Sequence, residues 1–124
     1  MKIAVCQINP ILGSFSYNLK KIKSFYKKAI KNNADLVVFP EMSVCGYPPQ
    51  DLVWESGFVS SCEDSLLSCA SFSTVPVIIG YIRNYNDNIY NSAALCEKGK
   101  VKYIYDKILL PTYDVFDEAR YFSR

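Results

Sequence analysis

Apolar and polar residues follow one another along the chain in an order that predicts short strands separated by helices. Residues 2–9 are apolar on both faces, which is typical of a strand in the centre of a sheet rather than at its edge. In residues 17–32 apolar side chains recur at helical spacing with lysines between them, which indicates an amphipathic surface helix. Residues 36–39 form a second apolar strand, so this part of the chain predicts a βαβ unit.

The second half of the chain predicts one more helix and three further strands. The helix is expected at residues 58–72, and a third buried strand at residues 75–82. Residues 90–96 and 101–107 then form two strands joined by a short turn, in which Gly99 can take the positive φ that a tight hairpin needs. We therefore expect an α/β domain with a mixed sheet, parallel in its first strands and antiparallel in its last.

The length and composition fit one domain without a membrane segment. With 124 residues, half of them hydrophobic, the chain can bury a real core. No apolar run approaches the roughly 20 residues of a membrane span, and the first residues lack the layout of a signal peptide. We therefore expect a cytoplasmic protein with no membrane partner. The net charge of +2 does not argue for nucleic acid, and a solvated helix face explains the lysines of residues 17–32 better than an acidic partner does.

The chain has no histidine and five cysteines, and both facts restrict its chemistry. Without histidine, the serine-histidine-aspartate, cysteine-histidine and histidine-metal sites are excluded, so proton transfer must fall to Glu, Asp, Lys, Tyr or Cys. The odd number of cysteines and the lack of a CxxC pair favour reduced, buried thiols over a disulfide framework or a zinc site.

Two charged residues stand at the ends of predicted strands, where α/β proteins bind ligands. Glu41 follows the strand at residues 36–39, which makes it a candidate general base, with a helix cap or a structural hydrogen-bond acceptor as the alternative. Lys107 closes the strand at residues 101–107 on the same side as apolar and aromatic residues, although a lysine at a strand end commonly reaches solvent. Position alone leaves these alternatives open.

The order of these two residues resembles the carbon-nitrogen hydrolase (nitrilase) superfamily, which carries a Glu, Lys, Cys triad. The chain has Phe-Pro-Glu at residues 39–41 and Lys-Ile-Leu-Leu-Pro at residues 107–111, as in that family, and Asn91-Ser92-Ala93 is also similar. The resemblance covers essentially the whole chain. It implies a nitrilase-like four-layer αββα sandwich with a mixed sheet, incomplete here because these residues would supply only its first half.

Two longer motifs resemble one branch, the glutamine-amidase domain of glutamine-dependent NAD+ synthetases. Residues 46–52 read Gly-Tyr-Pro-Pro-Gln-Asp-Leu, in which Gln50 replaces a Glu of that branch. Residues 110–122 read Leu-Pro-Thr-Tyr-Asp-Val-Phe-Asp-Glu-Ala-Arg-Tyr-Phe, close to a second segment of the branch. Two long motifs at the expected places favour this branch over the rest of the superfamily.

The resemblance implies roles for five residues. Glu41 would be the general base that activates a nucleophilic thiol, and Lys107 would stabilise the oxyanion of the tetrahedral intermediate. Tyr113 would help to hold glutamine, with a core tyrosine as the alternative. Phe116 and Glu118 would line or brace the same pocket.

The family's nucleophilic cysteine lies after these segments, so we expect it beyond the last residue and expect this chain to be inactive by itself. Cys62-Glu63-Asp64 looks like part of the nucleophile motif, but it precedes Lys107 and falls in a predicted helix. Cys45 is close to Glu41 in the sequence, and a small buried residue is the better interpretation.

The branch implies a parent protein that takes L-glutamine and passes ammonia to a C-terminal synthetase domain, which this chain lacks. ATP and Mg²⁺ belong to that domain, no cofactor or metal is expected for the amidase part, and the full-length parent is expected to be a homo-oligomer. Another amidase or N-carbamoyl hydrolase of the superfamily is one alternative, and a non-catalytic truncated remnant or interaction module is another. The absent strands would leave an uncovered apolar face, so we expect marginal stability or association.

Overall fold

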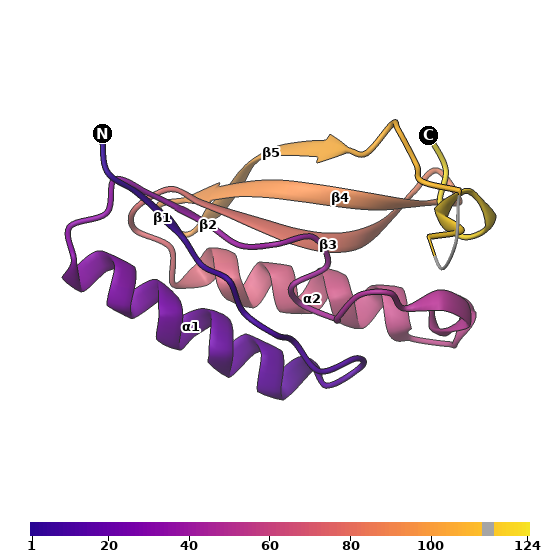
Figure 1. Cartoon of the computed structure of the whole chain (residues 1–124), viewed down its shortest axis with the longest axis horizontal. Coiled ribbons are helices and arrows are strands. Elements are labelled where there is room, and N and C mark those ends of the chain that lie inside the picture. The colour runs from indigo at the N-terminus through magenta and orange to yellow at the C-terminus, as the bar shows by residue number, and fades with distance from the viewer. Residues whose placement is uncertain (113–115) are drawn as a thin grey trace.

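The computed structural model describes residues 1–112 and 116–124, which form a five-stranded sheet with two helices packed on one of its faces (Figure 1). The strands are β1 (Ile3–Val5), β2 (Leu36–Val38), β3 (Val77–Tyr85), β4 (Asn88–Glu97) and β5 (Lys100–Asp106). The helices are α1 (Phe15–Lys31) and α2 (Phe58–Ser71), and two short 3-10 helices are η1 (Gln50–Trp54) and η2 (Glu118–Arg120).

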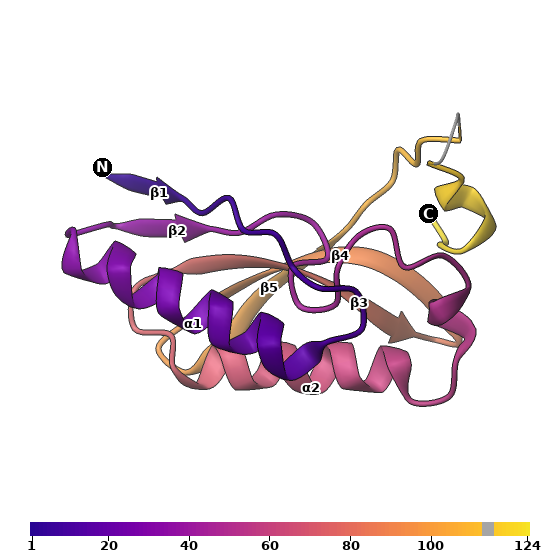
Figure 2. The same cartoon turned by 60° about the horizontal axis from the view of Figure 1, so that its bottom comes forward.

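The sheet is mixed, as the sequence predicts, with the strand order β1-β2-β3-β4-β5. The first three strands are parallel, and α1 and α2 make the crossovers between them on the same side of the sheet (Figure 2). The last three strands are antiparallel neighbours joined by tight turns. The turn residues Asn86, Asp87, Lys98 and Gly99 all have positive φ, the backbone conformation of a close hairpin. The predicted βαβ unit and the predicted hairpin are both confirmed.

The core lies between the sheet and the two helices. α1 buries Ile22, Tyr26 and Ala29, the stripe that its periodicity predicts, and leaves most of its lysines exposed. The buried residues of α2 include Cys62 and Cys69. All five cysteines are buried and carry free thiols, which confirms the prediction made from their number and spacing.

The sequence misplaces one element, the opening strand. Its pattern predicts a central strand, but β1 lies at the edge of the sheet beside β2. Ile3 and Val5 are 52% and 72% exposed, whereas Ala4 packs against the core. A strand that is apolar on both faces needs cover on both, and the helices cover only the face to which Ala4 belongs.

Much of the sheet face opposite the helices is open to solvent. Tyr103 and Tyr105 on β5 are 73% and 63% exposed, and they border a hollow together with Ile78 and Leu95. This matches the uncovered apolar face that the sequence predicts for part of a sandwich. Within residues 1–112 and 116–124, none of the helices has the length and apolar character needed to cross a membrane.

Candidate active site

Glu41 lies on the loop that leaves β2 at its carboxyl end, where the sequence places it. The loop turns at Met42, which has a positive φ of 48°. It is tied to β3 because Ser43 Oγ and the Val44 N–H donate hydrogen bonds to the Gly80 carbonyl, at 3.3 and 3.4 Å. A Cβ on Gly80 would stand 2.7 Å from the Glu41 Cα, so only glycine leaves room for the loop. The glycine at position 80 of β3 therefore allows the loop to approach closely and so sets the position of Glu41.

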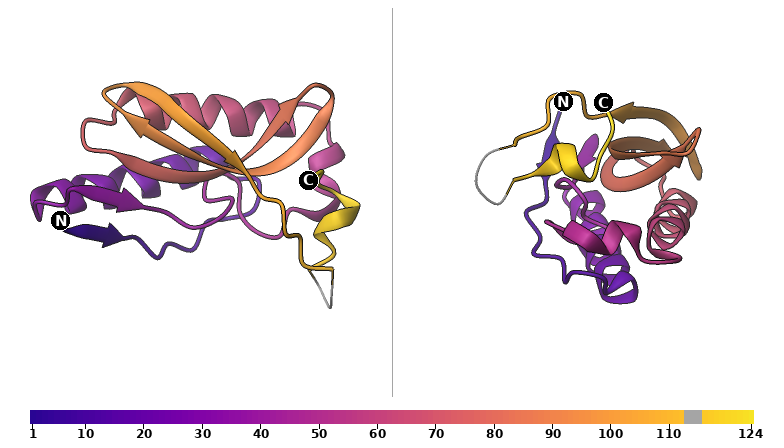
Figure 3. Two further views of the ribbon diagram at one scale, coloured as in Figure 1. Left: turned by 90° about the horizontal axis from the view of Figure 1, so that it is seen from above. Right: turned by 90° about the vertical axis from the view of Figure 1, so that its right-hand side faces the viewer.

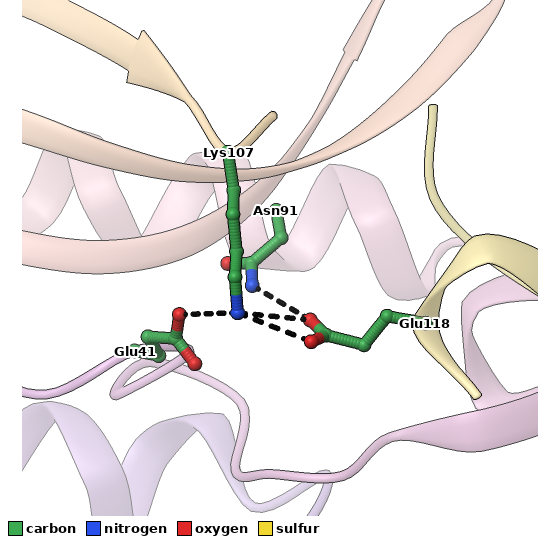
Figure 4. Close-up of polar contacts among 4 residues, drawn as sticks. All are labelled: Glu41, Asn91, Lys107 and Glu118. Carbon is green, nitrogen blue, oxygen red and sulfur yellow. Dashed lines mark hydrogen bonds and ion pairs between the residues drawn. The ribbon is translucent and has the colours of Figure 1, made fainter. Parts of the chain in front are cut away.

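Lys107 directly follows β5 and extends toward Glu41 (Figure 4). Its backbone N–H donates to the Asn91 carbonyl at 2.8 Å, which adds one more bond after the β4–β5 ladder. Its ammonium nitrogen lies 2.8 Å from Glu41 Oε1 and 3.1 Å from Glu118 Oε2. The fold thus brings together the two candidate catalytic residues and one of the expected bracing residues.

Glu118 is the buried carboxylate of this group. Its side chain is 5% exposed, against 51% for that of Glu41. Glu118 begins η2, and its backbone N–H donates to the Pro111 carbonyl at 3.0 Å. The carboxylate accepts hydrogen bonds from the Asn91 amide at 3.0 Å and from the Lys107 ammonium at 3.1 Å. This position suits the expected bracing role of Glu118, which stays a prediction.

The two carboxylates control the charge of Lys107. Partial burial lowers the pKa of the Lys107 ammonium, but hydrogen bonds to Glu41 and Glu118 and their charges outweigh it, so the pKa lies above its ordinary value. Lys107 therefore stays charged at neutral pH, as a group that stabilises an oxyanion must. Since the Glu41 side chain is half exposed and screened by water, the contact with Glu118 is the firmer of the two.

These charged groups open onto a hollow with largely apolar walls. Phe39, Ile78 and Tyr105 supply apolar surface, while Glu41 and Lys107 supply charge. Apolar walls with a few convergent polar groups are typical of small-molecule sites. Across the described part of the chain no three His, Cys, Asp or Glu residues gather in a way that could hold a metal ion.

The two long motifs pack against each other beside this hollow, where the C-terminal segment lies next to η1 (Figure 3). The ring of Phe116 stacks on that of Tyr47 with centroids 6.2 Å apart, and Tyr121 packs on Trp54 at 5.1 Å. This packing holds the segment that carries η2 in place. The expected pocket role of Phe116 stays a prediction, and Tyr113, the expected glutamine-binding residue, lies outside the described residues.

The cysteines have the surroundings of core residues. Cys45, in the same loop as Glu41, is fully buried, and its thiol pKa is raised first by a hydrogen bond with Cys62 and then by burial. Burial, with a smaller contribution from Cys96, raises the pKa of Cys69 to about 12. A nucleophilic thiol needs a lowered pKa and access to substrate, so Cys45 and Cys69 do not fit that role. Cys62 is fully buried within α2, where a helix was expected.

Asn91 is a site residue that the motifs did not mark as functional. It is 2% exposed within β4, and it contacts both Glu118 and Lys107. The sequence indicates it only through the resemblance of Asn91-Ser92-Ala93 to the superfamily. A physical signal was also present, because an Asn among the apolar residues of a strand must find partners for its buried amide.

Comparisons with known proteins agree with this geometry. The carbon-nitrogen hydrolase family profile matches residues 2–124. The glutamine-dependent NAD+ synthetases of Synechocystis sp. and Thermotoga maritima are each 38% identical, over 98% and 99% of this chain. The chain spans only 23% and 22% of the length of these two relatives.

Solved structures share the fold. The glutamine-dependent NAD+ synthetase from Acinetobacter baumannii superposes with a TM-score of 0.93 at 33% identity, over 98% of this chain and 23% of that one. An amidase from Nesterenkonia sp. superposes with a TM-score of 0.80 at 22% identity, over 96% of this chain and 46% of that one, and shows the fold alone. The nitrilase-like α/β fold predicted from the sequence is thereby confirmed. With a profile match over residues 2–124, the chain belongs to the carbon-nitrogen hydrolase family.

Proposed function

We propose that this chain is the N-terminal part of the glutaminase domain of a glutamine-dependent NAD+ synthetase, which hydrolyses L-glutamine to glutamate and ammonia. The observation that carries the proposal is the Lys107 ammonium held between Glu41 and Glu118 beside an apolar hollow. The curated relatives that carry this name match nearly the whole chain, and both long motifs of the branch pack next to the site. These facts support the branch as well as the family.

In the proposed reaction Glu41 accepts the proton of a cysteine thiol, and the thiolate attacks the amide carbon of glutamine. The oxyanion that forms faces the Lys107 ammonium, which is already charged and in place. When the intermediate collapses, the C–N bond breaks and ammonia leaves with the proton that Glu41 held. Water then hydrolyses the thioester to glutamate, again through an oxyanion beside Lys107, and the thiol is regenerated.

We assign the nucleophilic thiol to a part of the parent protein outside these 124 residues. The burial of all five cysteines supports this assignment, and so does the greater length of the relatives. The 124-residue chain is then inactive by itself, although it supplies the base and the oxyanion-binding cation.

The rest of the proposal concerns the parent protein. Ammonia released at this site would serve the ATP-dependent amidation of deamido-NAD+ in a C-terminal synthetase domain. ATP and Mg²⁺ would bind only in that domain, and the amidase part would need no cofactor. The parent would act in the cytoplasm as a homo-oligomer. The names and lengths of the curated relatives support this assignment of domains.

The test is a glutaminase assay of the full-length parent beside the 124-residue chain. Activity is expected only in the parent, with kcat/KM lowered about 10²–10⁴-fold in Glu41→Ala and about 10²–10³-fold in Lys107→Ala. Lys102 is an exposed lysine on β5, the strand that Lys107 follows, so Lys102→Ala is the matched control and should keep full activity. Faster turnover of simple amides or N-carbamoyl compounds than of glutamine would favour another branch. No turnover of any amide would favour a non-catalytic role.

A further inference from the structure

Asn91 makes hydrogen bonds with two different residues of the site, one through its side chain and one through its backbone. It lies within β4 and is 2% exposed. Its side-chain Nδ2 donates to Glu118 Oε1 at 3.0 Å (Figure 4). Its backbone carbonyl accepts from the Lys107 N–H at 2.8 Å. One buried residue therefore contacts both members of the Lys107–Glu118 ion pair.

We propose that Asn91 is a positioning residue, which holds the Glu118 carboxylate against Lys107 so that the ammonium stays aimed at the hollow. The inference rests on the proposed glutaminase function and deepens it. Asn91 acts through Glu118 and Lys107, so its loss should change the chemical step and leave the binding of glutamine nearly unchanged.

Glu118 needs such a partner because it does not come from the sheet. It reaches the site from the C-terminal segment, where η2 has only three residues, so no strand ladder fixes its position. Its carboxylate is 5% exposed, and Oε1 accepts from both Asn91 at 3.0 Å and Lys107 at 3.5 Å. A buried carboxylate needs donors, and a donor on a rigid strand also fixes its orientation. Of these two donors Asn91 has the shorter and stiffer side chain.

The position of Glu118 matters because Lys107 is shared between two carboxylates. If Glu118 moved away, the ammonium would pair with Glu41 alone. A carboxylate that is held in a full ion pair accepts a proton less readily, so the base would be weakened. The oxyanion would also face a less firmly placed cation. Both effects lower kcat and leave KM largely unchanged.

The kinetic test compares Asn91→Leu, Glu118→Gln and the double variant in the full-length parent. Asn91→Leu keeps the branching of the side chain at Cγ and removes the donor, so kcat should fall about 10- to 100-fold while KM stays within about twofold. The double variant should lose no more than Glu118→Gln alone, because both changes break the same contact. Ser73→Ala removes another buried hydrogen bond, 2.7 Å to the Ala70 carbonyl at the end of α2, and should keep its kcat.

A second measurement does not depend on activity. In the 124-residue chain, ¹⁵N NMR can follow the exchange of the Lys107 ammonium protons with water, which hydrogen bonds slow. Asn91→Leu and Glu118→Gln should each speed this exchange at least about fivefold. Should Asn91→Leu fail to fold, Asn91→Ala serves instead, since alanine removes the same donor without adding a charge and should speed the exchange likewise.

The two measurements separate the possible failures. Unchanged exchange in the Asn91 variant, unchanged kcat, or losses that multiply in the double variant would each overturn the positioning role. If the wild-type parent hydrolyses no glutamine, the proposed function fails. The exchange measurement then still decides whether Asn91 holds the Lys107–Glu118 pair.

Discussion

Replacing Gly80 by alanine should displace Glu41 while keeping the fold. The added methyl would stand 2.7 Å from the Glu41 Cα and 2.5 Å from the Met42 nitrogen, with the Pro40 carbonyl oxygen closer still. Non-bonded carbon atoms prefer about 3.5–4.0 Å, so the loop and β3 must separate by roughly 1 Å. Because these neighbours are all backbone atoms, no side chain can rotate aside to make room.

The expected magnitudes follow from that displacement. Inserting a methyl into a tight contact costs about 1–3 kcal/mol. Alanine loses less conformational entropy than glycine when it is fixed in a strand, which offsets about 0.5–1 kcal/mol of this cost. We therefore expect Gly80→Ala to lower the free energy of unfolding by about 1–2 kcal/mol. The same shift would lengthen the 2.8 Å contact between Glu41 and Lys107. A displacement of about 1 Å at a catalytic group can lower the rate about 100-fold.

Two assays check this reasoning. Urea unfolding of the 124-residue chain can be followed by the fluorescence of Trp54, its one tryptophan, and glutaminase activity is measured in the full-length parent. Gly99→Ala is the control, because its Cβ would meet open space and only its φ of 77° resists alanine. That strain should cost about 1 kcal/mol and leave activity unchanged. If Gly80→Ala keeps wild-type activity, or if Gly99→Ala loses as much, the steric account of Glu41 is wrong.

Three further predictions concern charge and exposed surface. The Arg83 hydrogen bonds hold the pKa of Asp106 below its usual range against the effect of burial, so this ion pair stabilises the fold above about pH 4 and its contribution is lost as pH falls further. Asp106→Asn should lower the free energy of unfolding in urea by about 1–3 kcal/mol at pH 7 and make that free energy less dependent on pH in acid. Partial burial lowers the pKa of Lys107, but its carboxylate partners raise it more, so the charged Lys107 stabilises the fold below about pH 10.4 and this contribution is lost at higher pH. Lys107→Met should abolish this loss of stability in alkali, and a dependence of stability on pH equal to that of the wild type would contradict the ion-pair account. Replacing exposed Tyr103 and Tyr105 by threonine should increase the monomer fraction in size-exclusion chromatography. Equal association of the variant and the wild type would show that another surface mediates the association.

Local patterns were enough to predict most of the fold. The helix at α1 and the hairpin of β4 and β5 depend on spacing and turn residues that lie close together in the sequence. The predicted central position of β1 was wrong for a physical reason. A strand that is apolar on both faces needs other elements packed on both, but the pattern does not say whether these 124 residues supply those elements. In these residues the helices cover one face, and Val5 is 72% exposed.

The candidate site was predictable only where a residue follows a strand directly. Glu41 and Lys107 could be found this way, and the structure places them 2.8 Å apart. The contact between Asn91 and Glu118 could not, because it joins a strand interior to a segment with little regular structure. Such a contact depends on how the C-terminal segment packs, and no local spacing in the sequence records that packing.

The structure also distinguishes the roles of the two carboxylates that contact Lys107, and this distinction does not depend on any resemblance. A general base must meet the proton that it takes, so it needs access to the hollow. Glu41 borders the hollow and its side chain is 51% exposed, whereas the Glu118 side chain is 5% exposed and accepts hydrogen bonds from Asn91 and Lys107. Burial thus favours Glu41 as the base and Glu118 as the fixed anion that orients the lysine. The two carboxylates should therefore not replace each other: Glu41→Gln should lower turnover about 10²–10⁴-fold even though Glu118 is unchanged, and turnover near the wild-type rate would show that Glu118 can serve as the base.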